Sequence, residues 1–140
     1  MVQQVGQQSS RGVKLAGAGD LGRGVRININ GTAVSYAGKV PVQVPQVSAK
    51  LWMSWNFAPG WEAQGGVRFA GQAYTDYANT QTRPGYTVVS LGFNWQPHPA
   101  LGFSARLQNA FDETYATIYY DGGYLLAPPL TAHFAMRVGF

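Results

Sequence analysis

The sequence has no cysteine, few charged residues and no long apolar run. Without cysteine there can be no disulfide framework, no thiol nucleophile and no cysteine-built metal site. Charged residues make up 11% of the chain, where about 25% is typical of soluble domains. No stretch approaches the roughly 18 consecutive apolar residues of a transmembrane helix. These absences exclude a disulfide scaffold and a helical membrane protein.

A nucleic-acid partner is also disfavoured. The formal net charge is +4, but the ten lysines and arginines are spread along the chain without a basic cluster. Scattered charges of this kind are typical of the polar faces of strands. We therefore expect no nucleic acid among the partners.

What the chain does contain is apolar and aromatic residues dispersed among small and polar ones. Hydrophobic residues reach 46% and aromatic residues 14%, and there are 18 glycines and 8 prolines. Glycine and proline at this frequency disfavour long helices and favour strands joined by turns. The composition predicts an all-β fold.

The end of the chain, residues 130–140, shows the alternation most clearly. One side of this segment carries Leu130, Ala132, Phe134, Met136, Val138 and Phe140, and the other carries Thr131, His133, Ala135, Arg137 and Gly139. A period of two with one wholly apolar face predicts a β-strand. Its length suits a tilted transmembrane strand of roughly 9–11 residues.

The same pattern recurs along the chain. It predicts seven strands, at 10–17, 25–37, 47–57, 61–75, 86–96, 101–111 and 130–140. Short turns near Asp20, Pro59 and Pro97 alternate with longer connections near Pro41, Asn79 and Tyr119. This layout is typical of an antiparallel up-and-down transmembrane β-barrel with short periplasmic turns and long outer loops, and it puts the C-terminus in the periplasm.

The aromatic residues indicate which face meets lipid. Aromatic side chains collect near the predicted strand ends, as in the interfacial girdles of membrane barrels. We therefore expect the apolar faces to contact outer-membrane lipid and the polar faces to line the lumen. The predicted lumen-facing charges are Lys14, Arg26, Arg68, Arg106 and Arg137. Seven strands cannot close an even-numbered barrel, so the chain should be part of a larger one.

Residues for chemistry are scarce. His98 and His133 have no second strong ligand at metal-binding spacing, so we expect no metal site. Asp112 and Glu113 are adjacent and should point apart, which makes a poor acid–base pair. No phosphate-binding loop or nucleophile triad is present. We expect neither an enzyme nor a cofactor.

The tyrosines of the longest connection are the candidate ligand contacts. Tyr115, Tyr119, Tyr120 and Tyr124 could stack on and hydrogen-bond to an aromatic ligand. The alternative is an interfacial aromatic belt with ordinary loop packing.

Several motifs in order then resemble a known family. The first strand contains Arg11-Gly12-Val13-Lys14-Leu15, and the middle of the chain contains Asp76-Tyr77-Ala78-Asn79-Thr80 followed by Pro84-Gly85-Tyr86-Thr87. Near the end comes Asn109-Ala110-Phe111-Asp112-Glu113-Thr114-Tyr115, and the chain closes on an aromatic residue. From Ser10 to Phe140 this resembles the C-terminal end of the β-barrel of TonB-dependent outer-membrane receptors, most of all the ferric-siderophore receptors. Lys14 and Ser90 depart from the acidic residues usual at those positions, and Ala127–Leu130 lacks a common arginine.

The resemblance implies a roughly 22-stranded barrel with a plugged lumen, of which residues 1–140 would form about the last seven strands. It implies import of ferric siderophores in the outer membrane of a Gram-negative bacterium, and a C-terminal motif of Phe134, Met136, Val138 and Phe140 for the barrel-assembly machinery. It also implies that Asn109, Asp112 and Tyr115 have a structural role at a strand end.

The plug domain and the TonB box that contacts TonB have no counterpart in this sequence. Residues 1–6 also lack the basic and apolar regions of a signal peptide. We therefore expect a fragment that does not transport by itself. Two alternatives stay open: a small passive, porin-like outer-membrane barrel, and a soluble lipocalin-like binding barrel.

Overall fold

The computed structural model describes residues 9–120 and 123–139, with the side chain of Tyr120 outside the description. Within these ranges the chain forms strands and no helix. No helix long and apolar enough to cross a membrane is found among these residues.

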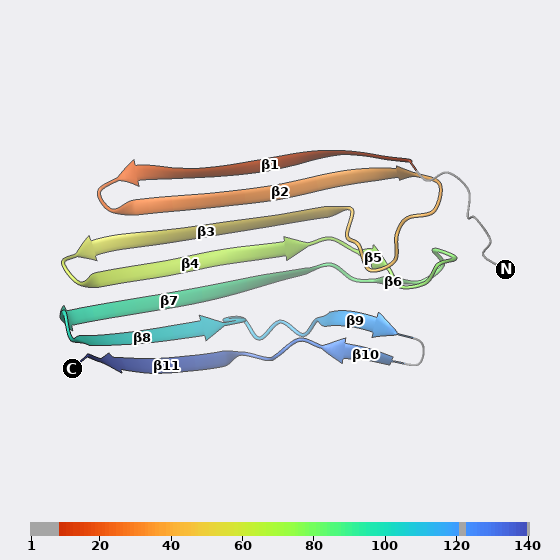
Figure 1. Cartoon of the computed structure of the whole chain (residues 1–140). Coiled ribbons are helices and arrows are strands. Elements are labelled where there is room, and N and C mark those ends of the chain that lie inside the picture. Colours follow the sequence, from red (N-terminus) through yellow and green to blue (C-terminus); the bar gives the residue numbers. More distant parts are fainter. Residues whose placement is uncertain (1–8, 121–122, 140) are drawn as a thin grey trace.

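The main body is a seven-stranded antiparallel sheet (Figure 1). Its strands are β1 (Ser9–Gly22), β2 (Val25–Ala37), β3 (Val47–Ala58), β4 (Trp61–Ala70), β7 (Tyr86–His98), β8 (Leu101–Gln108) and β11 (Thr131–Val138). They lie side by side in the order β1-β2-β3-β4-β7-β8-β11. The up-and-down order predicted from the alternation is confirmed. The sheet is not closed, because β1 and β11 form its two edges.

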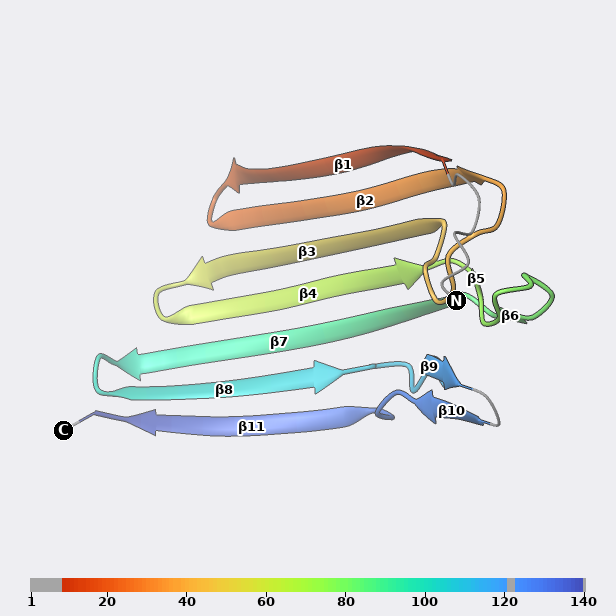
Figure 2. The same ribbon diagram turned by 45° about the vertical axis from the view of Figure 1, so that its right-hand side comes forward.

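Short and long connections are segregated to opposite ends of the sheet (Figures 1 and 2). Two-residue connections join β1 to β2, β3 to β4 and β7 to β8. Gly24 and Gly60 sit in the first two of these turns with φ angles of 78° and 76°, a region that favours glycine. Their carbonyls accept hydrogen bonds from Asn56 (2.9 Å) and Gln96 (2.7 Å) of the following strand. Each turn is thereby tied to the next hairpin.

The long connections contain two small sheets that the sequence did not predict. β5 (Ala73–Tyr74) pairs with β6 (Thr82–Arg83), and β9 (Ala116–Tyr120) pairs with β10 (Gly123–Leu126). The expectation of an irregular connection at 112–129 was wrong, because β9 and β10 form a hairpin there. The predicted strand 61–75 was also too long: regular pairing stops at Ala70, and Gly71 donates to the Val47 carbonyl instead.

Two further strand ends differ by a few residues from those predicted from the sequence. β1 continues to Gly22, where a turn was expected from Asp20, because Asp20 and Gly22 pair with Arg26 and Val25 across a bulge. β8 ends at Gln108, not at Phe111, because Asn109 and Asp112 have φ angles of 53°. An extended strand cannot include such residues.

A single-layer sheet has almost no core. Among the described residues the buried apolar side chains are Ala70, Ala73, Tyr86 and Ala116. Large apolar side chains such as Val13, Leu15 and Phe134 are exposed. A soluble domain of this size would bury such residues, so both the apolar face and the edges of this sheet need another environment.

Candidate functional site

The strand register sorts every side chain of the sheet onto one of two faces. Arg26 pairs with Ser54, Ser54 with Gln64, Gln64 with Gly92, Gly92 with Arg106, and Arg106 with His133. Directly paired residues point to the same face, and residues two positions along a strand share it. Lys14, Arg68 and Arg137 lie at other levels of the sheet, and the same rule places their side chains on the same face. All five predicted lumen charges therefore lie on one polar face.

The opposite face is apolar and carries an aromatic cluster at the short-turn end. Trp61 stacks on Trp95 with ring centroids 5.0 Å apart, and Trp95 stacks on Phe103 at 5.3 Å. Phe57 and Phe93 extend the cluster through contacts of 6.2 Å and 5.4 Å with Trp61. A continuous aromatic cluster at one level of a sheet matches the interfacial girdle of a membrane barrel.

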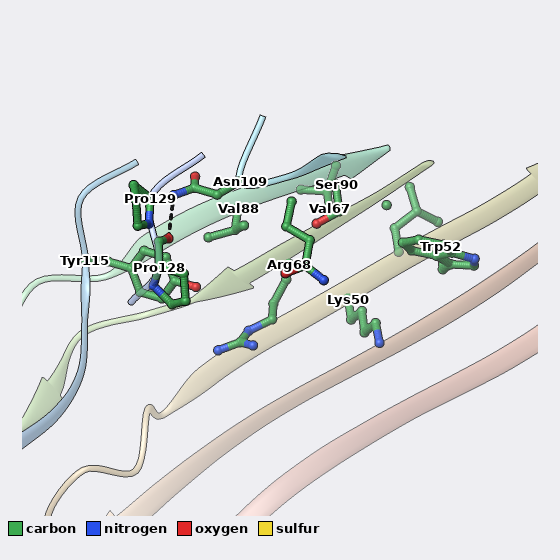
Figure 3. Close-up of a pocket in the computed structure, with 13 residues that line it drawn as sticks. Lys50, Trp52, Val67, Arg68, Val88, Ser90, Asn109, Tyr115, Pro128 and Pro129 are labelled. Carbon is green, nitrogen blue, oxygen red and sulfur yellow. Dashed lines mark hydrogen bonds between the residues drawn. The ribbon is translucent and has the colours of Figure 1, made fainter. Parts of the chain in front are cut away.

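The polar face is hollowed next to the loop that follows β8 (Figure 3). A depression of about 290 Å³ is lined by side chains of β3, β4 and β7 and by the loop that follows β8. Lys50 and Arg68 extend from the neighbouring strands β3 and β4, and Tyr115 with Pro128 closes the loop side. The Trp52 ring lies over Gly66, where an added Cβ would stand 2.1 Å from a ring atom. Glycine at 66 therefore makes room for Trp52.

A second depression, of about 420 Å³, lies toward the long connections and shares Lys50 and Arg68 with the first. Tyr86 also lines it, and the Tyr86 hydroxyl is hydrogen-bonded to the Arg68 guanidinium. The guanidinium carbons of Arg68 and Arg83 lie 5.3 Å and 5.4 Å from the centre of the Tyr86 ring, within cation–π range. Tyr115 stacks on the same ring at 4.1 Å.

The strand end after β8 is held by two side chains of the Asn109–Tyr115 motif. Asn109 is 3% exposed; its Nδ2 donates to the carbonyls of Glu113 (2.9 Å) and Pro128 (3.3 Å), and its Oδ1 accepts from the Glu113 amide (2.8 Å). The Asp112 carboxylate accepts from the Leu130 amide at 2.8 Å. These bonds join the start of the loop to its return and account for a structural role of Asn109 and Asp112.

The Asp76–Thr80 motif closes the loop between β5 and β6. The Asp76 carboxylate accepts hydrogen bonds from the Gln81 amide (2.8 Å), the Thr80 hydroxyl (2.7 Å) and the Thr80 amide. The bond from Gln81 first, and then the Thr80 hydroxyl, hold the pKa of Asp76 below its ordinary value. Both stabilise the charged form of an exposed carboxylate.

Hydrogen bonds also connect the three long connections to one another. Asn79 accepts from the Val40 amide (2.7 Å) and donates to the Val40 carbonyl (3.0 Å). The Gln43 amide donates to the Tyr74 carbonyl (2.7 Å), and the Gln43 side chain donates to the Tyr119 carbonyl (2.8 Å). The loops therefore form one cluster at the end of the sheet near the second depression.

The candidate tyrosines whose side chains the structure describes make ring contacts in two separate pairs with different partners. Tyr115 faces the depressions through its stacking on Tyr86. Tyr119 and Tyr124 face each other across the β9–β10 hairpin with centroids 5.7 Å apart. The side chain of Tyr120 lies outside the described residues.

The C-terminal motif lies on the apolar face of β11. Phe134 pairs with Ala105, Met136 with Phe103 and Val138 with Leu101. The three side chains are 81%, 64% and 47% exposed, as expected for an edge strand that lacks its neighbour. Phe140 lies outside the described residues.

The short-turn end of the polar face has mixed charge. Glu62 accepts hydrogen bonds from Gln64 and from Asn94 (2.8 Å), and Arg26 lies 3.8 Å from Asp20. His133 is the cross-strand neighbour of Arg106. No group of three or more metal-ligating side chains exists among the residues that the structure describes.

Comparison with known proteins identifies the family. A family model described as "TonB dependent receptor-like, beta-barrel" matches residues 1–110. The chain belongs to this family. Its relatives are receptors of the Gram-negative outer membrane and not enzymes, in agreement with the expectations from the sequence.

Individual proteins are similar to the chain in sequence or in fold. The chain is 28% identical to the ferrioxamine B receptor of Salmonella typhimurium over 79% of this chain and 18% of the relative. It superposes on the siderophore receptor PiuA of Acinetobacter baumannii with a TM-score of 0.85 at 19% identity, over 94% of this chain and 22% of that one. The ferripyoverdine receptor of Pseudomonas aeruginosa gives a TM-score of 0.82 at 22% identity, over 94% and 19%. The chain therefore spans about a fifth of the length of these proteins.

Sequence reasoning missed two members of the site. Arg83 lies in the connection predicted between the strands 61–75 and 86–96, and nothing local to Thr82–Arg83 indicates the pairing of β6 with β5. Tyr86 was predicted only as the start of the strand 86–96. The position of Lys50 opposite Arg68 depends on the register between β3 and β4.

Proposed function

We propose that this chain forms part of the barrel wall of a TonB-dependent receptor that imports ferric siderophores. The observation that carries the proposal is the division of the sheet into a polar face with all five predicted charges and an apolar face with the aromatic cluster. In the proposed barrel, Lys14, Arg26, Arg68, Arg106 and Arg137 face the lumen and the aromatic cluster faces lipid.

The unpaired edges support a larger barrel. β1 and β11 each have a neighbour on one side only, and unpaired backbone groups are costly in lipid. We infer that further strands of the receptor pair with both edges and complete a barrel of about 22 strands, of which residues 1–140 supply about the last seven. A plug domain and a TonB box would come from elsewhere in the receptor, and TonB would act through them.

The proposed orientation follows from the connections. Short turns face the periplasm in barrels of this kind and long loops face outward, which puts the end of β11 in the periplasm. Phe134, Met136, Val138 and Phe140 would then present the apolar pattern read by the barrel-assembly machinery. Tyr115, Tyr119, Tyr120 and Tyr124 would lie near the outer entrance. Tyr115 is the leading candidate for siderophore contact because it lines the first depression.

Family membership favours this function over the two alternatives from the sequence. A porin-like barrel and a lipocalin-like barrel share the alternation, but neither accounts for the match to receptor barrels over residues 1–110. The names of the relatives, which include receptors for ferrioxamine B and ferripyoverdine, support siderophores as the substrate class.

The test is iron uptake by cells that carry or lack the gene product containing this chain. Under iron limitation we expect radiolabelled ferric siderophore to accumulate only in cells with an intact gene, and uptake to stop when TonB is absent. Uptake that is unchanged by loss of the gene for every siderophore class tested would contradict the function. Uptake that persists without TonB would favour the passive barrel.

A further inference from the structure

Three cations gather on the polar face near the long connections. Lys50 of β3 and Arg68 of β4 are direct cross-strand neighbours. Arg83 of β6 joins them at the Tyr86 ring, which both guanidinium groups approach to within 5.4 Å. All three line the same depression of about 420 Å³. Like charges placed directly opposite each other destabilise a sheet, so this arrangement requires a reason.

No carboxylate among the described residues neutralises the cluster. Within residues 9–120 and 123–139, none of the three cations forms an ion pair. Arg83 is 5% exposed, and its Nε and Nη1 atoms have no hydrogen-bond partner in the described part of the chain. A buried, unpaired guanidinium is costly and projects its charge strongly, because little water screens it.

The acidic residues of the strands lie at the other end of the sheet. Asp20 is next to the β1–β2 turn and Glu62 is next to the β3–β4 turn. Within the strands, the polar face therefore carries only basic side chains toward the long connections and both signs of charge toward the short turns. The long connections themselves carry Asp76, Asp112 and Glu113, none of which forms an ion pair with the three cations in the described part of the chain. A wall of this kind attracts anions that arrive from the loop end.

We propose that Lys50, Arg68 and Arg83 form a site for a ferric chelate of net negative charge, one that presents catecholate or carboxylate oxygens. Lys50 and Arg68 are exposed and supply charge-assisted hydrogen bonds to these oxygens. Arg83 lies beneath them and contributes positive charge rather than contact. The stacked Tyr86 and Tyr115 rings hold both arginines in place. The proposal rests on the proposed import function and narrows its substrate class.

The experiment measures binding to the complete receptor that carries this chain, purified in detergent. Two synthetic probes are compared: a ferric tris-catecholate complex, which is anionic, and a ferric tris-hydroxamate complex, which has no net charge. The variants are Lys50→Gln and Arg68→Gln, alone and together, and both change exposed side chains. Arg137→Gln is the matched control on the same face at the short-turn end.

We expect each single variant to weaken binding of the anionic probe by about 10-fold to 100-fold, the range for a hydrogen bond to a charged group. The neutral probe and the Arg137→Gln control should be unaffected. Binding of the anionic probe to the unchanged receptor should also weaken as salt is added.

Three results would overturn the proposal. Equal losses for both probes would assign Lys50 and Arg68 a packing role. Unchanged binding of the anionic probe by both single variants and by the double variant would show that Lys50 and Arg68 do not contact the chelate. If the unchanged receptor bound the neutral probe and not the anionic probe, it would select uncharged ferric chelates, which is the opposite of the proposal. All three leave siderophore import standing, whereas a receptor that neither binds nor imports any ferric chelate would remove both proposals.

Discussion

Single polar side chains at strand ends decide where the strands of this sheet stop. Asn109 does so after β8, because its φ angle of 53° turns the backbone and its amide group then satisfies three backbone groups of the loop. Asparagine tolerates this conformation better than most residues. One residue therefore both ends a strand and fixes the return of the chain toward β11.

Asn109→Ala should lower the free energy of unfolding by about 1–3 kcal/mol, because it leaves buried backbone groups of the loop without partners. Urea-induced unfolding of the receptor in lipid vesicles measures the loss. Asn28→Ala is the control, since Asn28 is exposed on the polar face of β2. A loss of equal size in both variants would contradict the role of Asn109.

Asp76 gives the β5–β6 loop a defined response to pH. Its pKa lies below the ordinary value of 3.8, so the carboxylate stabilises the loop fully above that value, and this contribution disappears as the pH falls through the lowered pKa. Removal of the hydroxyl in Thr80→Val should raise the pKa of Asp76 toward its ordinary value. An NMR titration of the Asp76 carboxyl measures the shift. The unchanged receptor is the reference, and an Asp76 titration that is the same in both proteins would contradict the assignment.

At the scale of elements, each strand presents two chemically different faces to two environments. On β11, Met136 pairs with Phe103 on the apolar face, while its neighbour Arg137 pairs with Gly102 on the polar face. Adjacent positions of one strand should therefore respond in opposite ways to a change in polarity.

Met136→Arg should cost about 2–4 kcal/mol if position 136 lies near the middle of the bilayer, and less toward an interface. Arg137→Ala should cost much less, because it removes a charge that water can reach. Reversible folding into lipid vesicles under denaturant measures both changes in free energy. Equal costs would disprove the assignment of the two faces.

At the scale of the whole molecule, the main sheet is open, with β1 and β11 at its edges. The positions of its tryptophans indicate which face of the sheet would contact lipid. Trp55, Trp61 and Trp95 lie on the apolar face, and Trp61 and Trp95 stack together. Trp52 lies on the polar face over Gly66. In a barrel, the first three meet lipid and Trp52 meets the lumen.

Single-tryptophan receptor variants in vesicles of brominated lipid should separate these positions. The fluorescence of Trp61 and Trp95 should be quenched strongly by bromine near the headgroups, and that of Trp52 only weakly at any bromine depth. A soluble binding barrel predicts the reverse, because its apolar face is internal. Strong quenching of Trp52 would therefore contradict the lipid-facing assignment of the apolar side.

The sequence by itself determined the all-β fold, the positions of most strands of the main sheet and the division of their faces. These are local properties: a period of two sets the face of each residue, and glycine and proline set the turns. Even the roles of Asn109 and Asp112 followed from a contiguous motif. Tertiary structure alone decided the link from Asn79 to Val40, the pairing of Lys50 with Arg68, and the meeting of Arg68 and Arg83 at Tyr86. Those contacts join segments far apart in the chain, and they depend on strand register and loop packing, which no local pattern encodes.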